Sequence, residues 1–97
     1  MGSTFLEELF EVVKSRKSRF DSSSYTSKLM ASGLQKVLSK FGEESAELIA
    51  AACGEGNVVG EAADVLFHMM VVLAAKDVEF SEVIRELQRR RRWEGSG

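Results

Sequence analysis

The stretch VVGEAADVLFHMMVVLAA, residues 58–75, decides the fold. Its side chains are apolar on nearly every side of a helix, which is typical of a helix buried in a core. Polar residues interrupt it at i, i+3 and i+7, where Glu61, Asp64 and His68 form one narrow stripe. Carboxylates in apolar surroundings carry a large desolvation penalty unless a cation or a hydrogen-bond network offsets it. The stretch therefore predicts a buried helix with an acidic site on one side.

Helical periodicity extends over most of the chain, which contains no proline. The apolar spacing predicts four helices, over residues 4–17, 28–52, 58–76 and from about 81 towards 91. Thr4 and Ser81 are the expected N-caps of the first and the last. A serine-rich loop, 18–27, and the turn 54–57 are the main connections. No strand-like alternation remains. The predicted fold class is all-α, a four-helix chain forming a bundle in a single domain over 1–97 (core about 5–92).

Composition places the chain in the class of ordinary globular domains, since 44% of its 97 residues are hydrophobic and 29% are charged. Glu61 and Asp64 interrupt the longest apolar run, so no transmembrane span is expected. The amphipathic and acidic beginning is unlike a signal peptide. The single cysteine, Cys53, excludes an internal disulfide and is compatible with a reducing, cytoplasmic location.

A run of four arginines, 89–92, contrasts with the net charge of −2. Cations at the end of a helix complement its macrodipole, and such a turn is usually solvated. No interleaved aromatic residues or known nucleic-acid motif accompany the run, so we predict no nucleic-acid partner.

The predicted helix 28–52 has one charged face. At 100° per residue, Lys40, Glu43 and Glu47 lie within about 40° of Lys36, and Glu44 lies about 80° away. The opposite side is apolar and is the expected core face, formed by Leu34, Val37, Leu38, Phe41, Leu48, Ile49 and Ala52. This helix thus carries lysines followed by acids along one side.

The two acidic stripes can meet in one cleft if the helices 28–52 and 58–76 pack antiparallel, as their short connection favours. A dense group of carboxylates suits Mg²⁺ or Mn²⁺, because zinc prefers nitrogen and sulfur. The lysines one or two turns away are placed to meet phosphate oxygens. The simpler alternatives are a solvated face for Glu43, Glu44 and Glu47, and capping or ion pairing for Glu61 and Asp64. His68 is interpreted as a hydrogen-bonded interior residue and not as a ligand.

These residues resemble the pattern of the all-α nucleotide pyrophosphohydrolase (MazG-like) superfamily, E-E-x-x-E, a spacer, then E-x-x-D. The pattern stands here as EESAE at 43–47 and EAAD at 61–64. SSYTSKL at 23–29 and the flanks of both motifs are similar to the phosphoribosyl-ATP pyrophosphohydrolase family, over about residues 5–88. The turn CGEGNVVG, 53–60, departs from the family by being less charged, and it contains no motif residue.

The resemblance implies an enzyme of histidine biosynthesis that hydrolyses phosphoribosyl-ATP to phosphoribosyl-AMP and pyrophosphate. It implies that Glu43, Glu44, Glu47, Glu61 and Asp64 hold Mg²⁺ and serve catalysis. It also implies that Lys28, Lys36 and Lys40 contact phosphates, and that Ser24, Tyr25 and Thr26 shape the substrate pocket. A fused cyclohydrolase domain, which some family members carry, is not expected in a chain of this length.

The resemblance further implies a homodimer with the cleft near the subunit contact. Apolar stripes on the first and last helices (Phe5, Leu6, Leu9; Val83, Ile84, Leu87) are available to a partner.

Two other functions remain compatible with the sequence. One is pyrophosphate release from a different nucleoside triphosphate, and the other is a non-catalytic helical dimer that acts as an interaction module.

Overall fold

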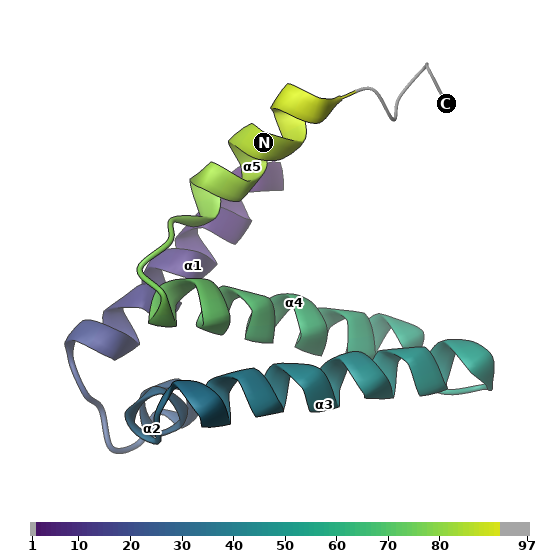
Figure 1. The fold of residues 1–97 in the computed structure, drawn as a ribbon, viewed down its shortest axis with the longest axis horizontal. Helices are drawn as coiled ribbons and strands as arrows, with labels where there is room; N and C mark the ends of the chain where they lie inside the picture. The colour runs from purple at the N-terminus through teal and green to yellow at the C-terminus, as the bar shows by residue number, and fades with distance from the viewer. Residues whose placement is uncertain (1, 92–97) are drawn as a thin grey trace.

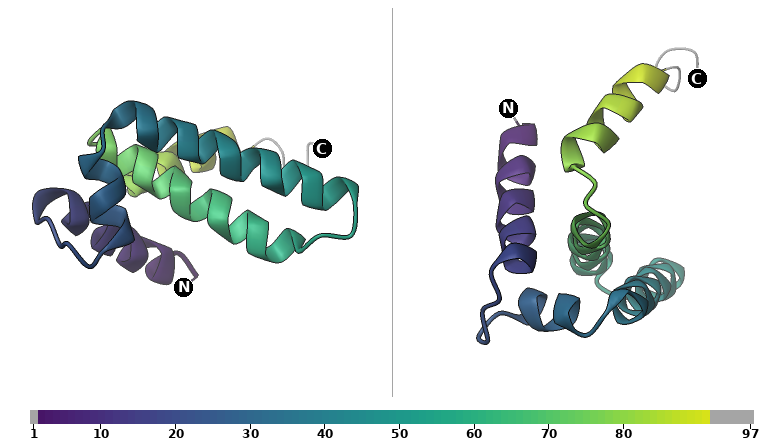
Figure 2. Two further views of the ribbon diagram at one scale, coloured as in Figure 1. Left: turned by 90° about the horizontal axis from the view of Figure 1, so that it is seen from below. Right: turned by 60° about the vertical axis from the view of Figure 1, so that its left-hand side comes forward.

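A computed structural model describes residues 2–91, and their side chains from Phe5 onward. This part of the chain is all-α, as predicted, and contains no strand. Its helices are α1 (Gly2–Ser18), α2 (Tyr25–Ala31), α3 (Leu34–Cys53), α4 (Val58–Ala75) and α5 (Phe80–Arg90). α3 and α4 lie side by side as an antiparallel hairpin, and α1 and α5 extend away from one end of it (Figures 1 and 2).

The hydrophobic core lies at the end of the hairpin where α1, α2 and the start of α5 meet α4. Its buried members come from all five helices: Phe10, Val13, Leu29, Val37, Met70, Val71, Ala74 and Phe80. Lys17 fastens α1 to the C-terminus of α4, because its Nζ donates to the carbonyl oxygen of Ala75 at 3.1 Å and to Asp77 Oδ1 at 2.8 Å. No other described helix covers the opposite end of the hairpin, where α3 is joined to α4.

The predicted helix 28–52 is two helices, because Gly33 interrupts it. Gly33 has a φ of 106°, which is outside the helical region and is readily adopted only by glycine. The chain turns there, so α2 packs across the end of the α3–α4 hairpin (Figure 1). The start of α2 replaces part of the predicted serine-rich loop, because the Ser24 side chain caps it by accepting a hydrogen bond from the Ser27 amide at 3.1 Å.

The other helix ends follow the prediction to within about two residues. α1 begins at Gly2, so Thr4 lies within it. α5 begins one residue earlier than predicted, and its N-cap is Glu79 instead of Ser81. The Glu79 amide donates to Glu82 Oε2 at 3.3 Å, which satisfies one of the free amides at this helix start.

The prediction that α4 is buried is correct only for its second half. His68, Met70, Val71 and Ala74 are buried, whereas Asp64 is exposed and Val59 is 81% exposed. The reason is the position of the core, since α1 and α2 cover the C-terminal part of α4 and leave its N-terminal part covered by α3 alone (Figure 2).

α4 is long and apolar enough to cross a membrane when judged by length and composition alone. The central helix of a globular protein meets the same criterion, and α4 packs against α1, α2 and α3. The criterion is therefore weak evidence here.

The core face of α3 also differs from the prediction. Val37, Glu44 and Ala51 are its buried residues, whereas Leu38 is 46% exposed and Ile49 is 65% exposed. The face of α3 that contacts α4 is thus rotated towards Glu44. Part of the apolar stripe of α3 that was predicted to face the core is left uncovered. With α1 and α5 extending away from the hairpin (Figure 1), the radius of gyration is 14.9 Å, compared with about 12.5 Å for a compact domain of this length.

The N-cap of α4 provides a test of local stability. The Asn57 side chain accepts a hydrogen bond from the Gly60 amide at 3.0 Å. We expect Asn57→Ala to lower the free energy of unfolding by about 1 kcal/mol, measured by urea denaturation at fixed protein concentration. Asn57→Ser, which retains a capping oxygen, is the matched control. Equal losses in both variants would contradict a capping role.

Candidate metal and nucleotide site

Three carboxylates from the two hairpin helices converge. Glu44 of α3 and Glu61 and Asp64 of α4 each offer an oxygen, and these three oxygens all lie within 4.8 Å of one another. The i, i+3 spacing of Glu61 and Asp64 puts both on one side of α4, and the antiparallel packing brings Glu44 to meet them. The cluster combines a buried, a half-buried and an exposed residue. It can therefore bind a cation on the protein side and still reach a ligand from solvent.

Glu61 is the member of this cluster that most needs a cation. Its Oε1 atom is buried and has no hydrogen-bond partner among the described residues. Burial raises the pKa of Glu61, and the neighbouring carboxylates of Glu47, Asp64 and Glu44 raise it further. A divalent cation would offset both the burial and the repulsion. The donor set consists of carboxylate oxygens, which fits Mg²⁺ or Mn²⁺.

Lys40 links this cluster to an adjacent cavity. Its Nζ lies 3.3 Å from Glu44 Oε2 and 3.7 Å from Glu43 Oε1. The hydrogen bond to Glu44 is the main reason why the pKa of Lys40 is raised, so this residue remains cationic. Lys40 offsets part of the charge of the buried Glu44 and keeps an ammonium group beside the cluster.

The adjacent cavity has a volume of about 260 Å³ and lies between α2 and α3. Its lining brings together a phenol, two ammonium groups and a carboxylate, from the residues Tyr25, Leu29, Lys36, Ser39, Lys40 and Glu43. Two cations on one wall suit an anionic ligand such as a phosphate chain. The cavity and the carboxylate cluster share Lys40 as their common neighbour.

The predicted site residues therefore separate into two groups. Glu44, Glu61 and Asp64 form the cluster, Glu47 lies close to Glu61, and Glu43 lines the cavity with Lys36 and Lys40. Of the segment predicted to shape the pocket, only Tyr25 lines the cavity. Ser24 caps α2 and Thr26 is buried. Lys28, which was predicted to contact phosphates, is exposed and does not line this cavity.

Two residues near the site were absent from the predicted set. Ser39 lines the cavity, and its position three residues after Lys36 and four before Glu43 was the available signal. His68 is buried and bonded through both ring nitrogens, to Tyr25 and to Asp64. Its interpretation as a hydrogen-bonded interior histidine is thus correct, yet it contacts a residue of the cavity wall.

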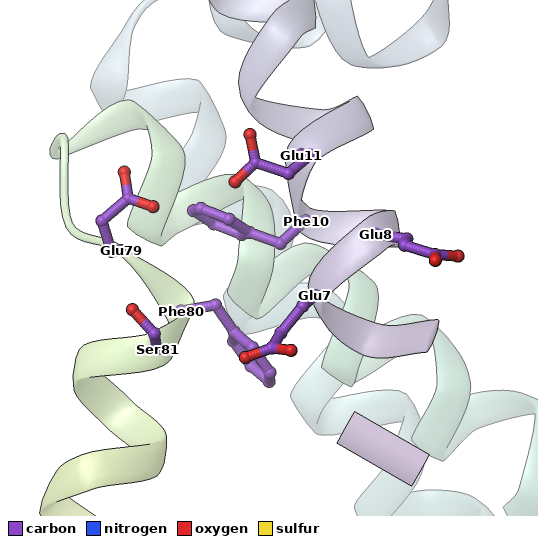
Figure 3. A pocket seen from close by; sticks show the side chains of 7 residues that line it. All are labelled: Glu7, Glu8, Phe10, Glu11, Glu79, Phe80 and Ser81. Carbon is purple, nitrogen blue, oxygen red and sulfur yellow. The ribbon is translucent and has the colours of Figure 1, made fainter. Parts of the chain in front are cut away.

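Another cavity lies elsewhere, between α1 and α5, with a volume of about 350 Å³. Phe10 and Phe80 face each other there, with ring centroids 6.1 Å apart, and carboxylates surround them (Figure 3). Four of its seven lining residues are glutamates: Glu7, Glu8, Glu11 and Glu79. Such a wall repels phosphate, so this cavity does not suit a nucleotide.

The described part of the arginine run pairs within its own helix. Arg89 and Arg90 both contact the carboxylate of Glu86, and Arg90 Nε lies 2.7 Å from it. These contacts hold the pKa of Glu86 down to about 2. Arg92 lies outside the described residues.

Known proteins are similar to this chain over most of its length. A family described as phosphoribosyl-ATP pyrophosphohydrolase matches residues 6–91. The phosphoribosyl-ATP pyrophosphatase of Ignicoccus hospitalis is 48% identical over 92 residues, which cover 93% of this chain and 90% of that protein. The protein of the same name from Rhodobacter capsulatus is 49% identical, over 90% of this chain and 86% of the relative.

A longer relative matches as well. The histidine biosynthesis bifunctional protein HisIE of Pyrococcus furiosus is 43% identical over 89 residues, which cover 92% of this chain and 42% of that protein. The similarity to all three relatives extends over at least nine-tenths of the chain.

Proposed function

This chain belongs to the phosphoribosyl-ATP pyrophosphohydrolase family, and from that premise we propose that it catalyses the Mg²⁺-dependent hydrolysis of phosphoribosyl-ATP. The products are phosphoribosyl-AMP and pyrophosphate, and the step belongs to histidine biosynthesis in the cytoplasm. The observation that carries the metal requirement is the convergence of oxygens from Glu44, Glu61 and Asp64 within 4.8 Å of one another, together with the buried Oε1 of Glu61, which has no hydrogen-bond partner among the described residues. An enzyme that cleaves a phosphate anhydride needs positive charge beside the phosphate oxygens, and a cation held by these carboxylates would supply it.

In this proposal the carboxylates hold the metal and the lysines hold the phosphate chain. Glu44, Glu61 and Asp64 would hold Mg²⁺, which would supply positive charge at the phosphate and favour deprotonation of the attacking water. Lys36 and Lys40 line the cavity and bind the phosphate oxygens. Glu43 and Glu47 complete the acidic set on the same side of α3 and orient water and metal. The oxygen of a water molecule bonds to the α-phosphorus, the bond from this phosphorus to the oxygen that bridges it to the β-phosphorus breaks, and pyrophosphate leaves. The proton that the water loses passes to solvent.

The reaction is tested by incubating the protein with phosphoribosyl-ATP and Mg²⁺ and following pyrophosphate release. We expect release that stops when EDTA removes the metal. Parallel reactions with dCTP and dUTP test the broader superfamily. Pyrophosphate from dCTP or dUTP but not from phosphoribosyl-ATP would overturn the substrate assignment, and no release from any nucleotide would favour the interaction module.

Metal binding has a readout that is independent of activity. At a free Mg²⁺ concentration one hundred times the dissociation constant, a ligand that binds only the folded state adds about 2.7 kcal/mol of stability. We therefore expect a clear rise of Tm with Mg²⁺ and a binding isotherm in calorimetry. Potassium chloride at equal ionic strength is the control for screening. Glu61→Gln should remove the Mg²⁺-specific rise, and an unchanged rise in this variant would place the ion elsewhere.

We extend the proposal to a homodimer that uses the uncovered face of the hairpin. Leu34, Leu38 and Ile49 lie on one side of α3 and are 41%, 46% and 65% exposed. Val58 and Val59 at the start of α4 are also exposed. Large apolar side chains that are exposed in this way are typical of subunit contacts. By contrast, Leu6, Leu9 and Ile84 of the predicted α1 and α5 stripes pack against the chain's own core.

A further inference from the structure

His68 has a defined tautomer because of the two groups that it contacts. It is the single histidine of the chain and is 7% exposed. Its Nδ1 atom lies 2.8 Å from the backbone carbonyl oxygen of Asp64. A carbonyl oxygen only accepts hydrogen bonds, so Nδ1 must carry the proton that it donates. In the neutral ring Nε2 is then unprotonated and can only accept.

Tyr25 supplies the hydrogen bond that Nε2 accepts. Its hydroxyl oxygen lies 2.9 Å from His68 Nε2. Burial is the largest cause of the raised pKa of Tyr25, so the phenol keeps its proton at physiological pH. A phenol has one proton to donate, and here it points to the histidine. Only the lone pairs of the Tyr25 oxygen remain for the cavity that this residue lines with Lys36 and Lys40.

We propose that His68 is a positioning residue that makes Tyr25 an acceptor, so that Tyr25 binds a hydrogen-bond donor of the nucleotide and not a phosphate oxygen. This assignment rests on the proposed function. An acceptor beside two ammonium groups fixes the orientation of the ligand, because the lysines bind the anionic oxygens and Tyr25 binds a neutral donor. Phosphoribosyl-ATP offers such donors in its ribose hydroxyls and in the exocyclic nitrogen of adenine. The cavity therefore recognises the nucleoside part as well as the phosphates.

The tautomer is tested first, without any substrate. Protein labelled with ¹⁵N-histidine has one pair of ring signals, and we expect, at mildly alkaline pH, a protonated Nδ1 and an unprotonated Nε2. Tyr25→Phe should shift the Nε2 signal towards that of an imidazole nitrogen without a hydrogen bond, with Nδ1 nearly unchanged. A protonated Nε2 in the wild-type protein would overturn the proposal.

Kinetics then test whether His68 acts through Tyr25. Loss of one neutral hydrogen bond is worth about a tenfold change. We expect Tyr25→Phe and His68→Leu each to raise KM for phosphoribosyl-ATP about tenfold with kcat little changed, because the contact is made equally in the ground and transition states. In the Tyr25→Phe background, His68→Leu should add almost nothing. His68→Gln, which can offer an amide oxygen to the phenol, is the conservative variant and should recover part of the loss.

The outcomes separate this inference from the proposed function. Absence of pyrophosphate release in the wild-type protein would contradict the function and leave the tautomer result standing. Normal activity with an unchanged KM in Tyr25→Phe would overturn only the acceptor role. Full additivity of the two substitutions would mean that His68 serves the fold alone.

Substrates prepared from 2′-deoxy-ATP and 3′-deoxy-ATP identify the donor. If Tyr25→Phe no longer raises KM with one of these substrates, the hydroxyl that this substrate lacks is the donor. If Tyr25→Phe still raises KM with both, the donor is the exocyclic nitrogen or a hydroxyl of the second ribose.

Discussion

Asp64→Asn is expected to lower kcat/KM for phosphoribosyl-ATP hydrolysis by about a thousandfold or more, equivalent to about 4 kcal/mol of transition-state stabilisation. Asp64 offers one of the three oxygens that lie within 4.8 Å of one another, and a neutral amide cannot supply its charge to a divalent cation. Because Asp64 is exposed, the substitution removes the ligand without opening the core. The helical fold should therefore remain, as measured by circular dichroism.

The matched control is Glu8→Gln, which makes the same kind of change on an exposed residue of α1. It should leave kcat/KM unchanged. Excess Mg²⁺ or replacement by Mn²⁺ should recover part of the activity of Asp64→Asn, since a weakened site is filled at higher metal concentration. If Asp64→Asn retains wild-type activity at low Mg²⁺, the carboxylate cluster is not the metal site.

Glu44→Gln is a less direct test of the same cluster. Glu44 is 6% exposed and pairs with Lys40. Removing its charge leaves the Lys40 ammonium without its nearest partner and changes the cavity wall as well. Loss of activity in that variant would combine two causes, and for this reason Asp64 is the better position.

Ile49→Glu is expected to turn the proposed dimer into a monomer. In a single chain this side chain is 65% exposed, so a glutamate there costs little. In a dimer that covers the apolar side of α3, two carboxylates would be buried without partners, at several kcal/mol. The dimer dissociation constant should rise about a thousandfold or more. Analytical ultracentrifugation over a range of protein concentrations measures it.

Phe5→Glu distinguishes the two surfaces that are candidates for the subunit contact. Phe5 is 66% exposed on α1, within the stripe that the sequence suggested for a partner. Dissociation by Phe5→Glu, with an intact dimer in Ile49→Glu, would move the contact to α1 and α5. A wild-type protein that is monomeric at all concentrations would remove the dimer from the proposal.

The helix bounds predicted from the sequence agree with the structure for some helices and not for others. The helix 58–75 was predictable almost to the residue because it is long and apolar, and glycine with Asn57 precedes it. The break at Gly33 was not, because an isolated glycine is tolerated inside a helix and the apolar spacing continues across it. The helix ends there because Gly33 adopts a φ of 106°, which lets α2 pack across the hairpin, and the apolar periodicity does not contain this turn.

The acidic motif likewise was predictable as a set of residues but not as an arrangement. Spacing alone puts Glu61 and Asp64 on one side of a helix, and Glu43, Glu44 and Glu47 around one side of another. It does not say which side of α3 meets α4. The phase count assigned Glu44 to the polar side, yet Glu44 is the one that is buried against the hairpin partner. It consequently became the α3 member of the cluster.

By itself the sequence determined the all-α class, the hairpin of two helices and the residue types of the site, because these depend on local periodicity and on the chemistry of carboxylates and lysines. The tertiary structure decided which three acids converge, that Glu61 has a buried oxygen without a hydrogen-bond partner among the described residues, and that His68 Nε2 accepts the hydrogen bond of the Tyr25 hydroxyl. The physical reason is rotation about the helix axes. A difference of one residue turns a side chain by 100°, and only the packing of α3 on α4 sets that angle.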